Sequence, residues 1–220
     1  MSILVKICGI NSAEAADAAV RAGADFGGLV FHPKSPRHLT LDAGRALAER
    51  LRERLRLVVL VADADDAAIA AAVAAVQPDY LQLHGHETPE RAGQIRARFA
   101  LPVIKAVAVA EAADFAQVPA YETVADMLLF DAKSDGGALR PGGHGAAFDW
   151  QLLRGRRFAR PWLLAGGLTQ ANVARAVAAS GAAGVDVSSG VETAPGVKSA
   201  QLIADFIAAA RNPQFAESRP

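Results

Sequence analysis

The stretch "PWLLAGGLTQANVARAVAASGAAGVDVSS" (residues 161–189) contains one full repeat of the pattern that decides the fold. An apolar run over 161–167 predicts a strand, and the alanine-rich segment 170–180 has the spacing of an amphipathic helix. A second apolar run follows at 184–189. Nearly continuous apolar strands separated by helices are typical of a parallel sheet that is covered by helices.

The same alternation extends over the whole chain. Strands are predicted at 3–8, 26–31, 56–62, 80–85, 102–109, 127–132, 161–167 and 184–189. Helical segments are predicted at 12–23, 41–53, 64–76, 89–99, 111–118, 148–154, 170–180 and 199–211.

This count of strand–helix units predicts the fold class. We expect an α/β fold, a single (β/α)8 TIM barrel of eight parallel strands with outer helices over residues 1–210, and a frayed tail over 211–220. The alternative is a doubly wound open sheet, which usually has fewer strands and begins with a glycine-rich dinucleotide turn. Here the first turn, "CGINS", has one glycine, which favours the barrel.

Composition excludes several classes of function. Lys and Arg together number 23, as do Asp and Glu, so the formal net charge is zero and neither nucleic-acid nor membrane-surface binding is indicated. The single cysteine cannot form an internal disulfide, which fits a reducing compartment. Lys6 interrupts the first apolar run, so no signal peptide is indicated, and we expect a cytoplasmic protein. Both a monomer and a homodimer are compatible with such a barrel.

In this fold the active site lies at the carboxyl ends of the strands. Gly166 and Gly167 follow one predicted strand, and Ser188, Ser189 and Gly190 follow the next. Backbone N–H groups and hydroxyls at these two positions commonly bind phosphate, so we expect a phosphorylated substrate there. The alternative is that these are ordinary glycine turns.

Cys8 ends the first predicted strand. A lone cysteine is most often a small buried hydrophobic residue. However, Lys6 is expected to share its face of the strand, about 6–7 Å below it. The ammonium group would then help to stabilise a thiolate, which can act as a base or as a nucleophile.

Asp131 and Arg37 are further candidates at the strand ends. Asp131 ends the strand at 127–132 and is either a turn aspartate or an acid held protonated by apolar surroundings. Arg37 is either a solvated loop charge or a guanidinium fork for a carboxylate. Asp186 is a possible buried partner for Lys6. The histidines 84, 86 and 144 form no zinc pattern with the cysteine, so no metal is expected.

Several motifs together resemble the phosphoribosylanthranilate isomerase family of tryptophan biosynthesis. They occur in the family's order over nearly the whole chain: "KICG" (6–9), "GLVFHPKSPR" (28–37), "LQLHG" (81–85), "LLFDAK" (128–133), "GGHGAAFDW" (142–150), "LAGGLTQANVARAV" (164–177) and "GVDVSSGVETAPGVKS" (184–199). The family usually reads "GGTG" where this chain has "GGHG", so His144 is a departure.

The resemblance implies a cofactor-free Amadori rearrangement, with a small phosphorylated molecule as substrate. It implies that Asp131 is the acid that opens the ribose ring and that Cys8 is the base at ribose C2. It further implies that Arg37 holds the anthranilate carboxylate and that a loop with Gly142 and Gly143 covers the substrate.

Three other functions fit parts of the sequence. An isomerase of histidine biosynthesis has related chemistry but an aspartate in the place of Cys8. A Schiff-base aldolase would use Lys105 or Lys133. A non-catalytic phosphosugar-binding barrel would not need the acid and base candidates.

Overall fold

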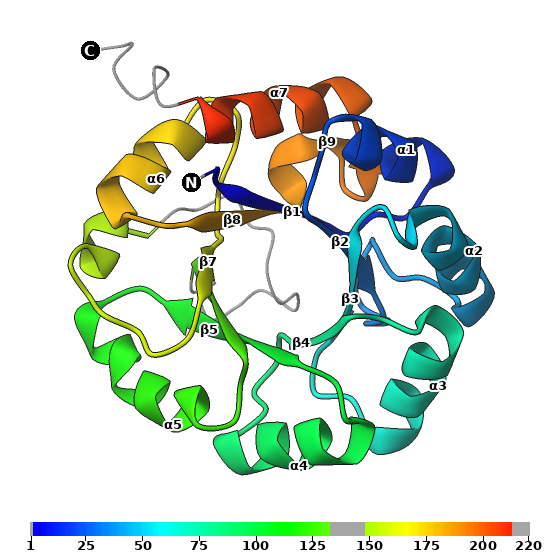
Figure 1. The fold of residues 1–220 in the computed structure, drawn as a ribbon, viewed down its shortest axis with the longest axis horizontal. Helices are drawn as coiled ribbons and strands as arrows, with labels where there is room; N and C mark the ends of the chain where they lie inside the picture. The colour runs from blue at the N-terminus through cyan, green and yellow to red at the C-terminus, as the bar shows by residue number, and fades with distance from the viewer. Residues whose placement is uncertain (1, 133–147, 213–220) are drawn as a thin grey trace.

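The computed structural model describes residues 2–132 and 148–212. Eight parallel strands form a closed barrel in the order β1 to β8, which confirms the predicted architecture (Figure 1). The strands are β1 (Leu4–Cys8), β2 (Phe26–Val30), β3 (Arg56–Val61), β4 (Tyr80–Leu83), β5 (Val103–Val109), β6 (Met127–Ala132), β7 (Trp162–Leu164) and β8 (Gly184–Val187). The register of β1 with β8, in which Lys6 pairs with Asp186, closes the barrel.

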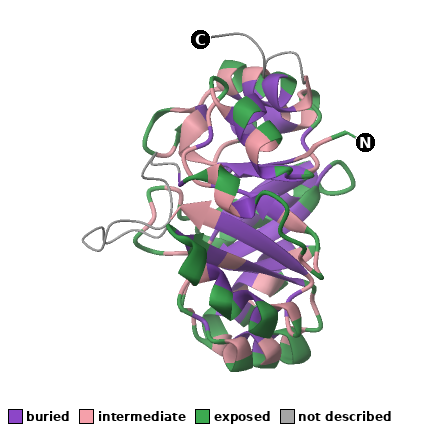
Figure 2. Cartoon of the chain, turned by 90° about the vertical axis from the view of Figure 1, so that its left-hand side faces the viewer, coloured by how far each residue is buried: buried purple, intermediate pink, exposed green. Residues whose placement is uncertain are grey.

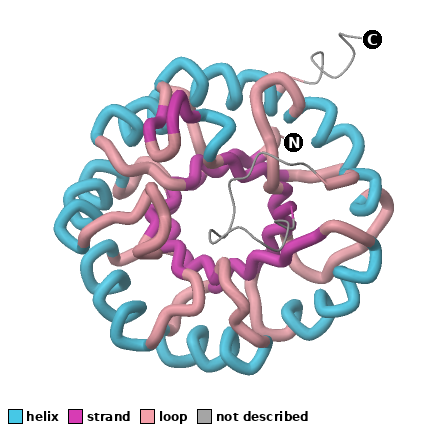
Figure 3. The backbone as a smooth tube through the Cα atoms, turned by 180° about the vertical axis from the view of Figure 1, so that it is seen from behind, coloured by secondary structure: helices cyan, strands magenta, loops and turns pink. Residues whose placement is uncertain are grey.

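Helices surround the ring of strands (Figure 3). The α-helices are α1 (Ala13–Arg21), α2 (Leu41–Leu51), α3 (Asp66–Val76), α4 (Pro89–Phe99), α5 (Val118–Glu122), α6 (Val173–Ser180) and α7 (Ala200–Arg211). Five of these helices, α1, α2, α3, α4 and α7, begin with a side-chain cap; for example, the Thr88 hydroxyl accepts a hydrogen bond from the backbone N–H of Arg91, and Pro89 follows in the first turn of α4. Within the described part of the chain, no helix is long and apolar enough to cross a membrane.

The connections after β5, β6 and β8 differ from the predicted helices. The segment after β5 begins as a 3-10 helix, η1 (Ala112–Gln117), before the short α5, and the described part of the β6 connection forms only η2 (Trp150–Leu153). After β8, a single 3-10 turn, η3 (Ser189–Val191), leads into a two-stranded hairpin of β9 (Glu192–Ala194) and β10 (Val197–Lys198). This hairpin was not predicted, because its two short strands lack a period that distinguishes them from a loop.

Apolar side chains fill the barrel below its carboxyl end. The interior cluster consists of Phe26, Val58, Ile104, Met127, Leu129, Leu163 and Ala165, and a larger cluster lies between the strands and the helices. The strands are accordingly buried, while the outer faces of the helices are exposed (Figure 2). This apolar packing closes the barrel interior beneath the carboxyl ends of the strands.

Three aspartates fasten neighbouring strands at the opposite, amino-terminal end. Each directly precedes an even-numbered strand, and its carboxylate accepts a hydrogen bond from a backbone N–H of the preceding odd-numbered strand. The pairs are Asp25 with Val5 at 2.7 Å, Asp79 with Leu57 at 2.6 Å and Asp126 with Val103 at 2.9 Å. These bonds link successive βαβ units far from the carboxyl ends of the strands.

Candidate active site

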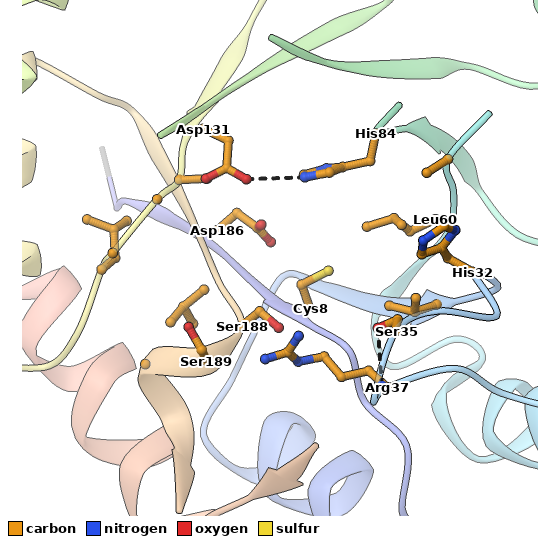
Figure 4. Close-up of a pocket in the computed structure, with 18 residues that line it drawn as sticks. Cys8, His32, Ser35, Arg37, Leu60, His84, Asp131, Asp186, Ser188 and Ser189 are labelled. Atoms are coloured by element: carbon orange, nitrogen blue, oxygen red, sulfur yellow. Dashed lines mark hydrogen bonds and ion pairs between the residues drawn. The ribbon is translucent and has the colours of Figure 1, made fainter. Parts of the chain in front are cut away.

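A single pocket at the carboxyl ends of the strands collects most of the predicted site residues (Figure 4). Its lining includes Cys8, Arg37, Asp131, Gly166, Gly167, Ser188, Ser189 and Gly190. Gly142 and Gly143, which were predicted to cover the substrate, lie outside the described residues, as does His144. The pocket thus brings together the predicted acid, base, carboxylate ligand and phosphate loops.

Cys8 lies at the top of β1, in contact with apolar Val30 and Leu60, and is 4% exposed. Beneath it, the fully buried Lys6 donates a hydrogen bond of 2.8 Å to Asp186, as the sequence suggested. Burial lowers the pKa of Lys6, but the Asp186 carboxylate and Cys8 more than compensate and raise it to about 12. The ammonium ion under Cys8 is therefore already paired.

The thiol of Cys8 responds to several opposing influences. Burial raises its pKa; the positive charge of Lys6 opposes this rise, and the negative charge of Asp186 adds to it. The net result is a pKa above the ordinary value of a thiol. The sequence-based expectation that Lys6 would help to stabilise a thiolate is correct in sign, but burial outweighs the effect.

Asp131 lies on the other side of the pocket from Cys8 (Figure 4). Its Oδ1 accepts a hydrogen bond of 2.9 Å from the backbone N–H of Ala132, and its Oδ2 lies 3.2 Å from Nε2 of His84. The other ring nitrogen, Nδ1 of His84, lies 2.9 Å from the amide nitrogen of the buried Gln82. If that amide donates, the His84 proton resides on Nε2 and points at Asp131.

Arg37 reaches the pocket from the β2–α2 loop, where its side chain is only 12% exposed. The guanidinium Nε and Nη2 donate to the two carboxylate oxygens of Glu192 at 2.6 and 2.8 Å. Lys198 donates to the same carboxylate at 2.7 Å. Burial opposes the ionisation of Glu192, but the hydrogen bond from Arg37 and the charge of Lys198 outweigh it and lower the pKa of that carboxyl group.

The two predicted phosphate loops follow the neighbouring strands β7 and β8 and lie side by side, since a Cβ on Gly190 would collide with the backbone carbonyl of Leu168. Gly166 has a φ of +84°, and a Cβ there would collide with the backbone of Ala132 and approach Oδ1 of Asp131 to 3.0 Å, so only glycine fits. Among the described residues, nothing accepts a hydrogen bond from the backbone N–H groups of Gly167, Ser189 or Gly190. These donors are therefore available to an anion.

Several residues that lie around the pocket were not recognised from the sequence, and the structure places one of the alternative candidates outside the pocket. His32, His84, Glu192 and Lys198 were not assigned roles from the sequence, although "LQLHG" and "GVETAPGVKS" contain three of them. Lys105, the candidate of the aldolase alternative, points away from the pocket and forms a buried ion pair with Glu87 at 2.8 Å. Lys133 lies outside the described residues.

Comparison with known proteins agrees with this arrangement. Residues 5–209 match the family of N-(5'-phosphoribosyl)anthranilate (PRA) isomerases. A relative from Beijerinckia indica, named N-(5'-phosphoribosyl)anthranilate isomerase, is 53% identical over 219 residues, which cover 100% of this chain and 99% of the relative.

Solved structures give the same result. Phosphoribosyl anthranilate isomerase from Thermotoga maritima has a TM-score of 0.84 and 36% identity, covering 94% of this chain and 98% of that one. A phosphoribosyl anthranilate isomerase in complex with reduced 1-(o-carboxyphenylamino)-1-deoxyribulose 5-phosphate has a TM-score of 0.81 and 34% identity, with the same coverage. The chain therefore belongs to the N-(5'-phosphoribosyl)anthranilate isomerase family.

Proposed function

We propose that this pocket carries out the reaction of the family with Cys8 as the base and Asp131 as the acid. The activity follows from the family: an aldose–ketose isomerase of tryptophan biosynthesis, which converts N-(5'-phosphoribosyl)anthranilate into 1-(o-carboxyphenylamino)-1-deoxyribulose 5-phosphate. The assignment of roles is supported by one observation above all. Cys8 and Asp131 lie on different sides of one pocket, which also contains Arg37 and the two predicted phosphate loops after β7 and β8.

The first chemical step opens the sugar ring. Asp131 gives its proton to the ring oxygen as the bond from that oxygen to C1 breaks, and the lone pair of the anthranilate nitrogen forms the C1=N bond of a Schiff base. The carboxylate left on Asp131 accepts hydrogen bonds from the Ala132 N–H and from Nε2–H of His84. Those two donors stabilise the charge that this step creates.

The second step transfers a proton from C2 of the sugar to Cys8. The ionised thiol of Cys8 removes the proton from C2, and the electrons of the C2–H bond form an enolamine, which tautomerises to the ketone. Because burial raises the pKa of Cys8, the reactive thiolate is a minor fraction near neutral pH. The rate of the free enzyme is therefore expected to increase with pH as the thiol ionises.

The remaining contacts position the substrate. Arg37 binds the anthranilate carboxylate, and the free backbone N–H groups of Gly167, Ser189 and Gly190 bind the phosphate with the hydroxyls of Ser188 and Ser189. Both anion sites belong to the pocket that also contains Cys8 and Asp131. A substrate with a carboxylate at one end and a phosphate at the other is held with its sugar between the acid and the base.

The assignment is tested by following the loss of anthranilate-type fluorescence with freshly prepared substrate. The protein should turn over this substrate, and Cys8→Ala and Asp131→Asn should each reduce kcat by a factor of about 10³ or more while the fold is retained. Asp42→Asn is a matched control, because the Asp42 side chain is 92% exposed and forms a surface ion pair with Arg45. Full activity in Cys8→Ala or in Asp131→Asn would remove that residue from the mechanism.

A further inference from the structure

The hairpin of β9 and β10 is an addition to the strand–helix repeat, and two of its side chains lie directly behind Arg37. Glu192 begins β9 and Lys198 ends β10, and their side chains are 3% and 0% exposed. Asn11, from the loop after β1, donates a hydrogen bond of 2.8 Å to the carbonyl of Gly196 at the hairpin turn. The hairpin is therefore tied to the loop that follows Cys8.

The carboxylate of Glu192 is saturated with donors. Its Oε1 accepts from Nε of Arg37 at 2.6 Å and from Nζ of Lys198 at 2.7 Å. Its Oε2 accepts from Nη2 of Arg37 at 2.8 Å and from the backbone N–H of Gly196 at 3.2 Å. Each oxygen thus accepts two hydrogen bonds, and the donors belong to two segments of the chain, the β2–α2 loop with Arg37 and the hairpin itself with Gly196 and Lys198.

This arrangement fixes which part of Arg37 faces the substrate. The edge formed by Nε and Nη2 is occupied by Glu192, whereas Nη1 has no acceptor among the residues that the structure describes. Figure 4 shows the guanidinium group extending toward Ser188, beside Cys8. The aliphatic stem crosses Gly9, whose φ is +74° and where any Cβ would overlap the stem.

The net charge of the cluster is complementary to the single negative charge of a carboxylate ligand. Arg37 and Lys198 are cations and Glu192 is an anion, so the three side chains together carry one positive charge. Lys198 also donates to the carbonyl of Ser188 at 2.9 Å, which links the cluster to the strand that bears the phosphate loop. Without Glu192, two buried cations would face each other with no shared counter-ion.

We propose that Glu192 and Lys198 are positioning residues that determine specificity for the substrate carboxylate, by holding the Arg37 guanidinium with only its Nη1 side open to the pocket. The inference rests on the proposed role of Arg37 in binding that carboxylate. Glu192 does not contact the carboxylate itself, which would repel it. It acts by orienting the fork and by limiting its charge.

Glu192→Gln separates this positioning role from a simple charge effect. An amide has one oxygen and one NH2 group, and the NH2 group cannot accept a hydrogen bond. In one orientation the NH2 group would face the donors of Arg37 and Lys198, and in the other it would face those of Arg37 and Gly196. At least one bond of the fork must break, and Arg37 is displaced. Removal of the negative charge alone has the opposite effect, because it makes the site more positive and strengthens the binding of any anion.

The test compares two competitive inhibitors, anthranilate and inorganic phosphate, in the intact protein. For Glu192→Gln we expect the inhibition constant of anthranilate to increase about tenfold, and that of phosphate to stay within about twofold or to fall. The KM for the substrate should increase with a smaller change in kcat, since binding rather than chemistry is affected. Asp42→Asn, an exposed surface change, should alter neither constant.

The results distinguish a failure of the positioning role of Glu192 from a failure of the proposed carboxylate site at Arg37. Tighter or unchanged anthranilate binding in Glu192→Gln, or an equal loss for anthranilate and phosphate, overturns the positioning role. If Arg37→Met still binds anthranilate, the proposed carboxylate site itself is wrong. If Arg37→Met loses anthranilate binding but Glu192→Gln retains it, the carboxylate site stands and only the positioning role of Glu192 fails. Should Glu192→Gln not fold, Glu192→Asp serves instead, because it keeps the negative charge but shortens the side chain by one methylene. Glu192→Asp should weaken the binding of anthranilate and leave the binding of phosphate unchanged. If both inhibitors bind as they do to the wild type, the inference is contradicted.

Discussion

At the scale of single residues, the chemistry of the pocket depends on buried charges whose effects oppose one another. Cys8 has Lys6 beneath it, but Lys6 is paired with Asp186, and the thiol is desolvated. The pKa of Cys8 is therefore a balance rather than the result of one neighbour. Composition alone favoured an inert cysteine; its position above a buried ion pair, at the edge of the pocket, supports its proposed role as the base.

Lys6→Met should raise the pKa of Cys8 further, because it removes the ammonium group that opposes the effect of burial. The pH dependence of Cys8 alkylation by iodoacetamide measures this directly: the midpoint should move to higher pH, and kcat/KM near neutral pH should fall. The loss of one partner from the buried pair also costs about 3–5 kcal/mol, so folding must be confirmed by circular dichroism. An unchanged midpoint in folded protein would show that Lys6 does not influence the thiol.

His84→Asn should reduce kcat about tenfold to a hundredfold, because it removes one of the two donors to the Asp131 carboxylate. Alkylation of Cys8 should be unaffected, since His84 contacts Asp131, the proposed acid, and not Cys8, the proposed base. Steady-state kinetics on the variant, with alkylation rates as the control, provide the measurement. A wild-type kcat would mean that the contact between His84 and Asp131 has no part in the reaction.

At the scale of elements, the carboxyl ends of the strands form the pocket, whereas their amino-terminal ends stabilise the fold. The carboxyl ends carry the pocket, and the amino-terminal ends carry the three aspartates that bind the backbone of the preceding strand. Asp126 is also held by a two-bond fork from Arg96. Burial opposes the ionisation of Asp126, but Arg96 and the Val103 N–H outweigh it and lower the pKa of the carboxyl group.

Asp126→Ala should lower the free energy of unfolding by about 1–3 kcal/mol near pH 7 and leave kcat per folded molecule unchanged. A carboxyl group with a lowered pKa in the folded state stabilises the protein above its ordinary pKa, and this contribution is lost as the pH falls through the lowered value. The difference between wild type and variant should therefore shrink toward about pH 3. Urea unfolding at the two pH values tests this, and a difference that grows in acid would contradict it.

At the scale of the whole molecule, the barrel could be predicted because its signal is local and repeated. Each of the eight strands lies where an apolar run was found, although β7 is shorter than its run over 161–167. Parallel barrels place their sites at the carboxyl ends of the strands, and this rule correctly predicted that Cys8, Asp131 and the loops after β7 and β8 line one pocket.

The remainder of the site depends on contacts that the sequence does not encode locally. Arg37 and Glu192 are 155 residues apart, and Lys6 and Asp186 are 180 apart. The Lys6 pairing could be anticipated because neighbouring strands of a closed barrel share a register. The Glu192 contacts could not, since they depend on a hairpin whose two short strands have no recognisable period.

The most direct test of the central claim is a crystal structure of this protein with reduced 1-(o-carboxyphenylamino)-1-deoxyribulose 5-phosphate. Our account places the sugar C2 about 3–3.5 Å from Sγ of Cys8 and the sugar oxygen that receives the proton within hydrogen-bond reach of Asp131. It also places the carboxylate on the Nη1 side of Arg37 and the phosphate against the backbone of Gly167 and Ser189. A sugar bound away from Cys8, or a ligand with its carboxylate and phosphate exchanged, would contradict it.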